Sequence, residues 1–334
     1  MPFKIKLRRT KRYNVLSKNC FLSRIRLLNS SEIQCTLSMD STGLECLEAV
    51  AQRLELCETH YFGLWFVGKN QQARWVELEK PLRKQLDKFS VEPVLYFGVM
   101  FYVPNVSYLN QSVTRYQYYL QLRKNVYDGQ VHCTVDQYIR LAALAIQVEF
   151  KDYNLFETQD FLRECMLFPV GWTQDATLLE ELLLKVALEH KAVSGMRPEE
   201  AEVLYIQEVQ QLDGYGQECF HVKDSHSNDV TLCIFFMGIF VGDNHGKSSA
   251  SFRWNDIGNI THNKSAIVLE LNRKEESVLF HTDDIENSKY ISRLFATRMK
   301  FYKENKICTE QPITPPTIRR QPTWSRSSMS RQQA

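Results

Sequence analysis

Residues 112–129 read SVTRYQYYLQLRKNVYDG, and this stretch decides how the chain is organised. It contains no proline, and its single glycine stands at the end, where helices commonly stop. We therefore expect a helix over Val113–Asp128 that is capped by Gly129. A cluster of tyrosines on this helix is expected to pack in a core: Tyr116, Tyr118 and Tyr119.

Helical signals continue in the C-terminal direction. Thr134 and Gln137 have the spacing of a capping box, which predicts a helix that runs to Phe150. Further helices are expected at Thr158–Met166, at Ala176–Lys191, and from Pro198 to Leu212. Together these segments predict a helical lobe over residues 105–213, which is an ordinary size for a domain.

The residues before this lobe predict a mixed lobe over 20–104. Thr42 and Glu45 have capping-box spacing and start a helix. Its apolar stripe is expected to be Leu44, Leu47, Ala51 and Leu54. A second helix is expected over Pro81–Phe89, and strands over Cys20–Leu28, Ile33–Met39, Tyr61–Val67, Arg74–Leu78 and Val94–Val103. This order of strands and helices is typical of a ubiquitin-like roll.

The residues after the helical lobe predict a third lobe over 214–305. Strands are expected at Cys219–Lys223, Val230–Val241, Ala250–Trp254, Ile257–His262, Ala266–Leu271 and Val278–Thr282. A long helix then runs from Asp283 to Lys303, with Ile291, Leu294, Phe295, Arg298 and Phe301 along one side. Strands closed by one long helix are typical of a pleckstrin-homology or phosphotyrosine-binding barrel.

The two ends of the chain differ from its middle in charge. Residues 1–12 hold six bases and no acid, and residues 311–334 hold four bases and no acid. The whole chain has a net charge of +2, so the middle is acidic. We expect a basic arm over 1–19 and a disordered, proline-, serine- and arginine-rich tail over 306–334.

The three expected lobes, in this order, resemble the FERM family. The central lobe carries the similarity through residues 115–124, Gly129 and Leu141–Gln147. The first lobe resembles the family at Trp75–Pro81, and the third at Phe252–Ile257. The resemblance implies an α+β multidomain fold with a ubiquitin-like roll, an acyl-CoA-binding-protein-like helical bundle and a PH/PTB-like barrel that ends in a helix.

Within this family, Lys6–Tyr13 and Phe97–Pro104 resemble the FERM region of Pez-type non-receptor tyrosine phosphatases. That resemblance implies a targeting region whose full-length relatives carry a phosphatase domain. The chain departs from the family pattern at Cys233, where glycine is usual, and at Met299, where histidine is common.

The sequence offers no usable catalytic site. A tyrosine phosphatase needs a Cys-x₅-Arg loop, and the only match, Cys20 to Arg26, lies in an expected strand without glycine. His132-Cys133 imitates half of the motif, but Arg140 comes one residue too late. We expect no enzyme, no cofactor and no metal site in this chain. The nine cysteines are scattered without a Cys-x-x-Cys pair and are expected to be reduced thiols.

Function should therefore lie in surfaces, and the first is basic. Lys80, Arg83, Lys84 and Lys88 recur on the second helix of the first lobe. The family resemblance implies that bases in this region bind phosphoinositide headgroups. A solvated helix face is an equally good explanation of the same residues.

The second candidate surface is a peptide groove in the third lobe. PTB-like lobes bind extended peptides by strand addition between their last strands and the closing helix. By position this groove would be lined by six residues: Ser265, Ile267, Leu269, Ile291, Phe295 and Met299. The apolar ones among them also suit an ordinary core.

The third candidate is the tail. Arg319 and Arg320 precede Thr323 at the spacing that basophilic kinases prefer, and Ser325 follows. A phosphate at Thr323 or Ser325 would recruit a phosphopeptide reader.

These surfaces predict an adaptor that binds tails of membrane or junctional proteins, acidic phospholipids and actin-linked proteins. No run of eighteen apolar residues and no secretory signal is present, so we expect a cytoplasmic, cortical or junctional location with a possible nuclear fraction. The alternative is a nuclear or nucleic-acid-binding protein that acts through residues 1–12. It predicts binding that salt weakens steeply.

Overall fold

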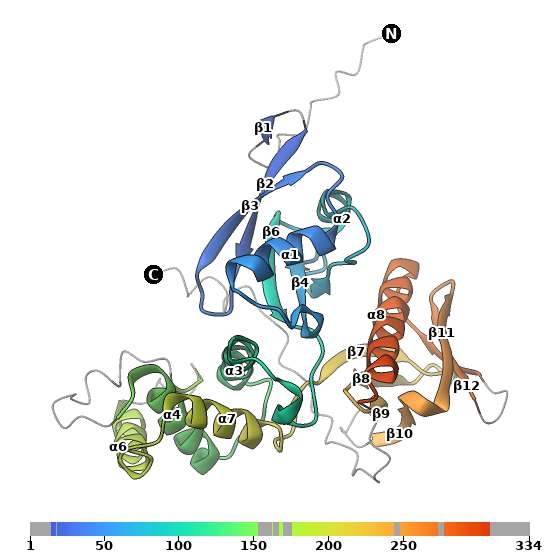
Figure 1. Cartoon of the computed structure of the whole chain (residues 1–334). Coiled ribbons are helices and arrows are strands. Elements are labelled where there is room, and N and C mark those ends of the chain that lie inside the picture. The colour runs from blue at the N-terminus through green and yellow to red at the C-terminus, as the bar shows by residue number, and fades with distance from the viewer. Residues whose placement is uncertain are drawn as a thin grey trace. The chain divides into compact units, whose positions relative to one another are not determined.

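The computed structural model describes residues 15–17, 19–152, 162, 167–169, 176–243, 248–272 and 277–307 (Figure 1). The helix expected at 158–166 therefore lies largely outside the described residues, as do most of the basic arm and of the tail. Contacts divide the chain into two compact units, and the boundary between them falls between Met100 and Phe101.

The first unit is one sheet with two helices. Its strands are β1 (Val15–Ser17), β2 (Cys20–Arg26), β3 (Glu32–Ser38), β4 (Phe62–Val67), β5 (Ala73–Trp75) and β6 (Val94–Val99), and its helices are α1 (Gly43–Arg53) and α2 (Leu82–Phe89). The hydrogen-bonded order is β1-β2-β6-β4-β5, and β3 pairs with β2 on its other side. Only the β2–β6 pair is parallel, as in the ubiquitin-like roll that the sequence predicted.

Helix α1 buries a different stripe from the expected one. Thr42 caps the helix as predicted, and its side chain accepts the Glu45 N–H at 3.3 Å. Leu47 and Ala51 are buried, but Leu44 is 43% exposed, so its placement in the core was wrong. The buried face is completed by Cys46 and Val50, because positions 46, 47, 50 and 51 share one side of a 3.6-residue helix.

The helices of the second unit's first half follow the prediction closely. They are α3 (Ser112–Tyr127), α4 (Val135–Phe150), α6 (Ala176–Ala192) and α7 (Pro198–Val209). The capping box of Thr134 and Gln137 forms with both of its hydrogen bonds. Gly129 adopts a φ of 71°, the left-handed conformation that glycine allows at a helix end.

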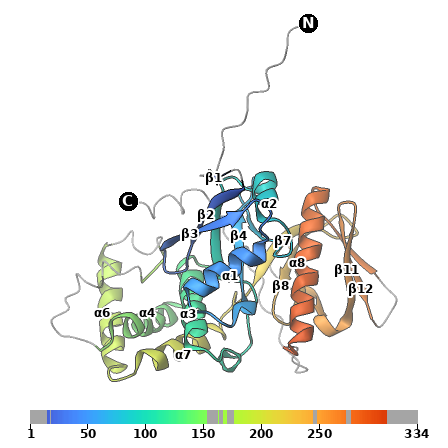
Figure 2. The ribbon, with the colours of Figure 1, turned by 45° about the horizontal axis from the view of Figure 1, so that its top comes forward.

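The rest of the second unit is a seven-stranded sheet with one long helix. The strands are β7 (Glu218–Lys223), β8 (Asp229–Ile234), β9 (Gly238–Gly242), β10 (Ser248–Arg253), β11 (Ile257–Asn263), β12 (Ala266–Leu271) and β13 (Ser277–His281), and the helix is α8 (Ile285–Glu304). Their order is β10-β9-β8-β7-β13-β12-β11. Figures 1 and 2 show α8 alongside β11, and the expected apolar side of α8 is buried.

The single strand expected over Val230–Val241 was wrong. It is two strands, β8 and β9, that form a hairpin with Cys233 opposite Phe240. The turn between them ends at Gly238, where a side chain would collide with the carbonyl oxygen of Phe252. The close approach of these two backbone segments explains why glycine is needed there.

A buried, extended segment opens the second unit, and side-chain hydroxyls satisfy its backbone. The Tyr302 hydroxyl accepts the Tyr102 N–H at 3.1 Å and donates to the Tyr102 carbonyl at 3.0 Å. The Tyr118 hydroxyl accepts the Val103 N–H at 2.8 Å, and the Tyr215 hydroxyl donates to the Val103 carbonyl at 2.6 Å. Tyr118, Tyr215 and Tyr302, here called the hydroxyl clamp, tie α3, the loop before β7 and α8 to one segment.

The cysteine prediction was wrong for one pair. Cys219 on β7 and Cys233 on β8 are direct cross-strand partners and form a disulfide, with their Cα atoms 4.1 Å apart. Cys233 is fully buried in a cluster with Phe235 and Phe240, and Cys219 is only partly buried. Within the described part of the chain, five further cysteines are outside any disulfide: Cys20, Cys35, Cys46, Cys57 and Cys133.

Candidate docking surfaces

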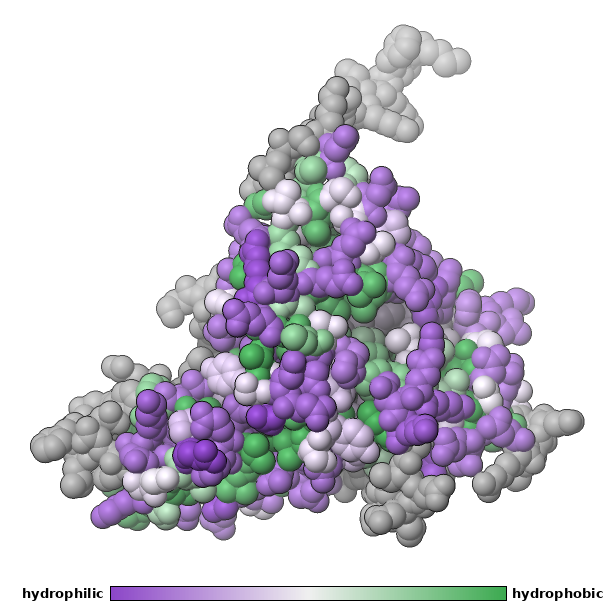
Figure 3. All heavy atoms as spheres, viewed as in Figure 1, coloured by the Kyte–Doolittle hydropathy of each residue, from purple (hydrophilic) through white to green (hydrophobic). Residues whose placement is uncertain are grey.

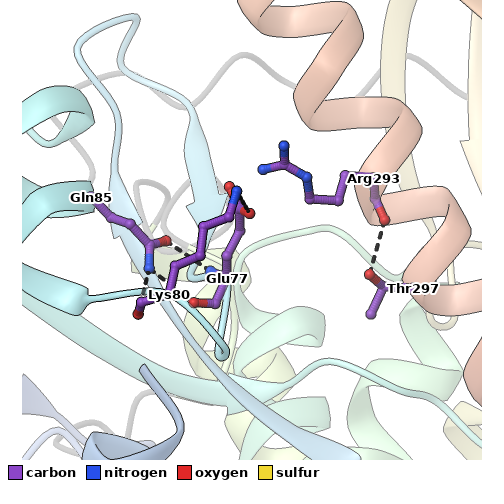
Figure 4. Close-up of polar contacts among 5 residues, drawn as sticks. All are labelled: Glu77, Lys80, Gln85, Arg293 and Thr297. Carbon is purple, nitrogen blue, oxygen red and sulfur yellow. Dashed lines mark hydrogen bonds and ion pairs between the residues drawn. The ribbon is translucent and has the colours of Figure 1, made fainter. Parts of the chain in front are cut away.

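The bases expected to form a lipid site do not all present free charge. Lys80 lies before α2, and its ammonium forms an ion pair with Glu77 at 2.6 Å (Figure 4). Gln85 holds this turn in place, because its side chain binds both the N–H and the carbonyl of Glu77. Arg83 pairs with Asp87 at 3.6 Å on the same helix. Lys80 and Arg83 are thus partly neutralised within the first unit.

Lys84 and Lys88 lie one helical turn apart on α2, and both are exposed. The fold adds two bases that the sequence pattern did not group with them. The Lys69 ammonium donates to the Lys88 carbonyl at 2.5 Å, and the Arg74 guanidinium lies 4.0 Å from the ring centroid of Phe89. We call Lys69, Arg74, Lys84 and Lys88 the α2 basic cluster.

The β4–β5 hairpin positions the two added bases. The Lys69 N–H donates to the carbonyl of Phe89 at 2.9 Å, which fixes the hairpin against the end of α2. Phe89 is flanked by Arg74 and by Lys88, whose ammonium lies 4.6 Å from the ring. Cations at the C-terminal end of a helix also meet its negative dipole, so part of this arrangement stabilises α2 itself.

The residues predicted to line a peptide groove lie mostly in the core of the third lobe. Ile267, Leu269 and Phe295 have no exposed surface, and Ile291 is 5% exposed. Ser265 and Met299 are only partly buried. A peptide would meet the four apolar residues only after they moved out of the core.

The predicted groove residues that precede α8 do not lie on a sheet edge. Ser265, Ile267 and Leu269 lie on or next to β12, which pairs with β11 on one side and β13 on the other, so β12 offers no edge for an added strand. The edge belongs to β11, beside α8. Peptide binding in this lobe stays a prediction, and β11 and α8 are where it would occur.

The β11 edge is itself partly occupied by side chains. The Ile260 N–H donates to the neighbouring Asn259 Oδ1 at 2.9 Å. From α8, the Ser292 hydroxyl donates to the Thr261 carbonyl at 2.8 Å, and the Lys303 ammonium donates to the Ile257 carbonyl at 2.6 Å. An added strand would have to displace the Asn259 contact before it could pair with Ile260.

The two partial matches to a phosphatase motif, Cys20 to Arg26 and His132-Cys133, are unsuited to catalysis. Cys20 and Arg26 lie at the two ends of strand β2, about 20 Å apart at the usual rise of a strand, so they cannot hold one phosphate. Burial raises the pKa of the Cys133 thiol to about 12, which disfavours the nucleophilic thiolate. Thr134, the next residue, caps α4.

The turn between β7 and β8, which contains His226, is held together by Asp224. Both the N–H and the side chain of Asn228 bind the Asp224 carboxylate, at 2.8 and 2.9 Å, and the His226 N–H donates to it at 2.8 Å. These bonds lower the pKa of Asp224, with the Asn228 side chain the largest cause. Within the described part of the chain, no three His, Cys, Asp or Glu side chains are placed to hold a metal ion.

The described surface shows no single dominant apolar patch on the face in Figure 3, where hydrophobic side chains lie scattered among hydrophilic ones. Among the described helices, none is long and apolar enough to cross a bilayer. Thr323 and Ser325 lie outside the described residues, so phosphorylation of the tail stays a prediction.

Three family models match the chain in the order of its lobes. The FERM N-terminal domain matches residues 25–88, the FERM central domain matches 104–220, and the FERM C-terminal PH-like domain matches 224–309. The chain therefore belongs to the FERM family. Its fold agrees with that of solved relatives: the FERM domain of Drosophila Merlin superposes with a TM-score of 0.77 at 22% identity, over 85% of this chain and 97% of that one.

Among curated proteins, the chain is 69% identical to human "Tyrosine-protein phosphatase non-receptor type 14" over its whole length. It is 52% identical to the rat "Tyrosine-protein phosphatase non-receptor type 21" over 96% of its length, and 28% identical to human "Band 4.1-like protein 2" over 86%. The chain spans only 28%, 27% and 28% of these relatives, respectively. It is thus similar to the FERM region of the two phosphatases.

Proposed function

We propose that this chain is a non-catalytic docking module that links membrane-protein tails and acidic lipids to the cortical cytoskeleton or to cell junctions. The 69% identity to the FERM region of a tyrosine phosphatase carries the proposal. By this likeness the module serves as the targeting region of a phosphatase, and it acts in the cytoplasm at the cell cortex. The similarity to a band 4.1-like protein supports the cytoskeletal side.

The lipid-binding part of the proposal rests on the α2 basic cluster. Each lysine or arginine near an anionic membrane surface contributes about 1 kcal/mol within a Debye length. Lys69, Lys84 and Lys88 together would contribute about 3 kcal/mol, which is on the order of a hundredfold in vesicle affinity.

The test is co-sedimentation with phosphatidylcholine vesicles that contain phosphatidylserine and a phosphoinositide. The K69Q/K84Q/K88Q variant should lose on the order of a hundredfold in affinity. The control, K185Q/K191Q, removes two exposed lysines from α6 and should bind like the wild type. Losses in proportion to the charge removed, three lysines against two, would show that net charge alone drives binding and would overturn the assignment to this cluster.

The non-catalytic part is tested directly. The chain should hydrolyse para-nitrophenyl phosphate no faster than buffer, because Cys20 and Arg26 lie at opposite ends of one strand. Turnover that disappears in a Cys20→Ser or Cys133→Ser variant would refute the proposal.

The peptide-binding part concerns the β11 edge and α8. Because Asn259 Oδ1 occupies the Ile260 N–H, Asn259→Ala should strengthen strand addition there. Titration of the chain with extended peptides from membrane-protein tails, followed at the amides of β11, checks this. Peptides that bind without any change at Ile260 would exclude this edge as their site.

A further inference from the structure

The outer edge of β3 in the first sheet carries unused backbone hydrogen-bonding groups. Bonds at both ends of the β2–β3 ladder fix which residues face outward: Leu27 N–H to Ser31 O at 2.9 Å, and Met39 N–H to Asn19 O at 3.0 Å. Hydrogen-bonded pairs alternate along an antiparallel ladder, so the odd-numbered residues of β3 bond to β2. The even-numbered residues direct their N–H and C=O groups away from the sheet: Glu32, Gln34, Thr36 and Ser38.

One of these four positions is already capped. The Ser38 N–H donates to the Ser41 hydroxyl at 3.1 Å. The backbone groups of Glu32, Gln34 and Thr36 have no such partner within the described residues. Their side chains are exposed on one face of the sheet, while Cys35 and Leu37 are buried on the other face.

The other described edges are protected in ways that β3 is not. Strands β1 and β5 have three residues each, and β10 and β11 contain register shifts. Beside β11, side chains of α8 bind backbone carbonyls. Short strands, bulges and covering helices are the usual protections of a sheet edge. Strand β3 has seven residues, a continuous register, no proline and no lysine, so it is suited to strand addition.

The sequence of the N-terminal arm fits this edge. Residues 3–8 read FKIKLR, a strict alternation of apolar and basic residues, which is the period of a strand with one apolar and one basic face. With Ile5 beside Ile33, the apolar face would continue the layer that Ile33, Cys35 and Leu37 form. The basic face would then lie beside Glu32, the one charged residue of β3.

The arm is also long enough. Val15 of β1 pairs with Phe21 of β2, and Leu37 of β3 pairs with the same Phe21 from the other side. At about 4.8 Å between strands, a strand added outside β3 lies about 15 Å from β1. The seven backbone steps from Arg8 to Val15 span up to about 23 Å. This reach favours an arm that runs parallel to β3 and places Lys4 next to Glu32.

We propose that residues 3–8 of this chain add a strand to the outer edge of β3, with Phe3, Ile5 and Leu7 on the side of α1 and Lys4, Lys6 and Arg8 on the exposed face. The arm thereby occupies a site that an extended segment of another protein would otherwise take.

Amide hydrogen exchange, resolved residue by residue, tests the proposal. The full chain is compared with a chain that lacks residues 1–9. The amides of Glu32, Gln34 and Thr36 should exchange on the order of tenfold faster in the shortened chain. The amides of Ile33, Cys35 and Leu37 bond to β2 and should be slow in both, which gives an internal control on the same strand. Equal rates for the even-numbered amides in both chains would overturn the proposal.

Two further measurements separate the arm from other occupants. The I5N/L7N variant removes the apolar face and should behave like the shortened chain, whereas T10N, in the connecting segment, should behave like the wild type. A synthetic peptide of residues 2–10 should restore slow exchange to the shortened chain, and a shuffled peptide of equal composition should not. Protection that rises with protein concentration would assign the edge to a second copy instead and refute the arm.

Discussion

Removing one hydroxyl from the clamp, by Tyr302→Phe, should destabilise the second unit strongly. The ring would keep its contacts, because Tyr302 stacks on Trp254 with ring centroids 5.9 Å apart and meets Phe101 edge-on. Only the hydroxyl is lost, and with it the partners of the Tyr102 N–H and carbonyl. Tyr302 has no exposed surface, so water cannot readily replace these bonds.

The magnitude follows from the two groups left behind. A buried backbone group without a partner costs about 1–3 kcal/mol, so the loss of both partners should cost the variant about 2–6 kcal/mol. For a unit of this size, each kcal/mol lowers Tm by about 2–4 °C, so even the smallest of these losses predicts a Tm lower by about 4–8 °C. Urea unfolding and calorimetry, followed in parallel, measure both quantities.

The matched control is Tyr127→Phe at the end of α3, since Tyr127 is partly exposed and lies in the same unit. It should stay within about 0.5 kcal/mol of the wild type. If Tyr302→Phe lost as little free energy of unfolding as Tyr127→Phe, the hydroxyls would not hold the Tyr102–Val103 segment. Packing of the rings alone would then explain how this segment is held.

Two more outcomes are expected in the second unit. Cys219→Ser, or reduction of the wild type, should lower the free energy of unfolding by about 3 kcal/mol, since the bond to Cys233 closes a loop of about 15 residues. Urea unfolding with and without dithiothreitol checks this, and an unchanged midpoint would contradict it. Burial raises the pKa of Glu202 to about 7, with Arg115 opposing the shift. Because the folded pKa is raised, protonation stabilises the fold below about pH 4.5, and this contribution disappears as the pH rises through 7. Glu202→Gln should therefore gain about 2–3 kcal/mol over the wild type between pH 5 and pH 8, and parallel stability curves would refute the assignment.

Local signals in the sequence predicted the helices well. The capping box of Thr134 and Gln137 and the cap at Thr42 depend only on neighbours three residues away, and both are present. Leu44 was misplaced because a stripe of leucines does not say which side of a helix meets the sheet. The cap and the spacing of the apolar residues can be read from the sequence, but the side of the helix that faces the core cannot.

The disulfide was missed because the strands Cys219–Lys223 and Val230–Val241 were expected, but the register between them was not worked out. The turn that joins β7 and β8 is closed by the Asp224 N–H, which donates to the Asn228 carbonyl at 2.9 Å. A hairpin centred on that turn places Cys219 opposite Cys233, as the register shows. Counting cysteines and their spacing along the chain does not reveal such a pair, but counting outward from the turn does.

The basic cluster shows a second limit. Lys84 and Lys88 were found because they lie one turn apart on one helix. Lys69 and Arg74 come from a hairpin that folds against the end of α2, so their grouping depends on tertiary contacts. Sequence spacing in this chain therefore finds charges that share an element and misses charges that the fold brings together.

The edges of the two sheets show which strands could accept an added peptide strand. The sequence places strand addition in the third lobe because that lobe resembles a PTB-like barrel, and it places the groove between the last strands and the closing helix. The hydrogen bonds show that β12 is paired on both sides and that the Ile260 N–H of β11 already donates to the side chain of its neighbour, Asn259. On β3, by contrast, successive even-numbered residues present unpaired backbone groups within the described chain. Affinity in strand addition comes mainly from such groups, so the first sheet has the stronger physical claim to an extended ligand.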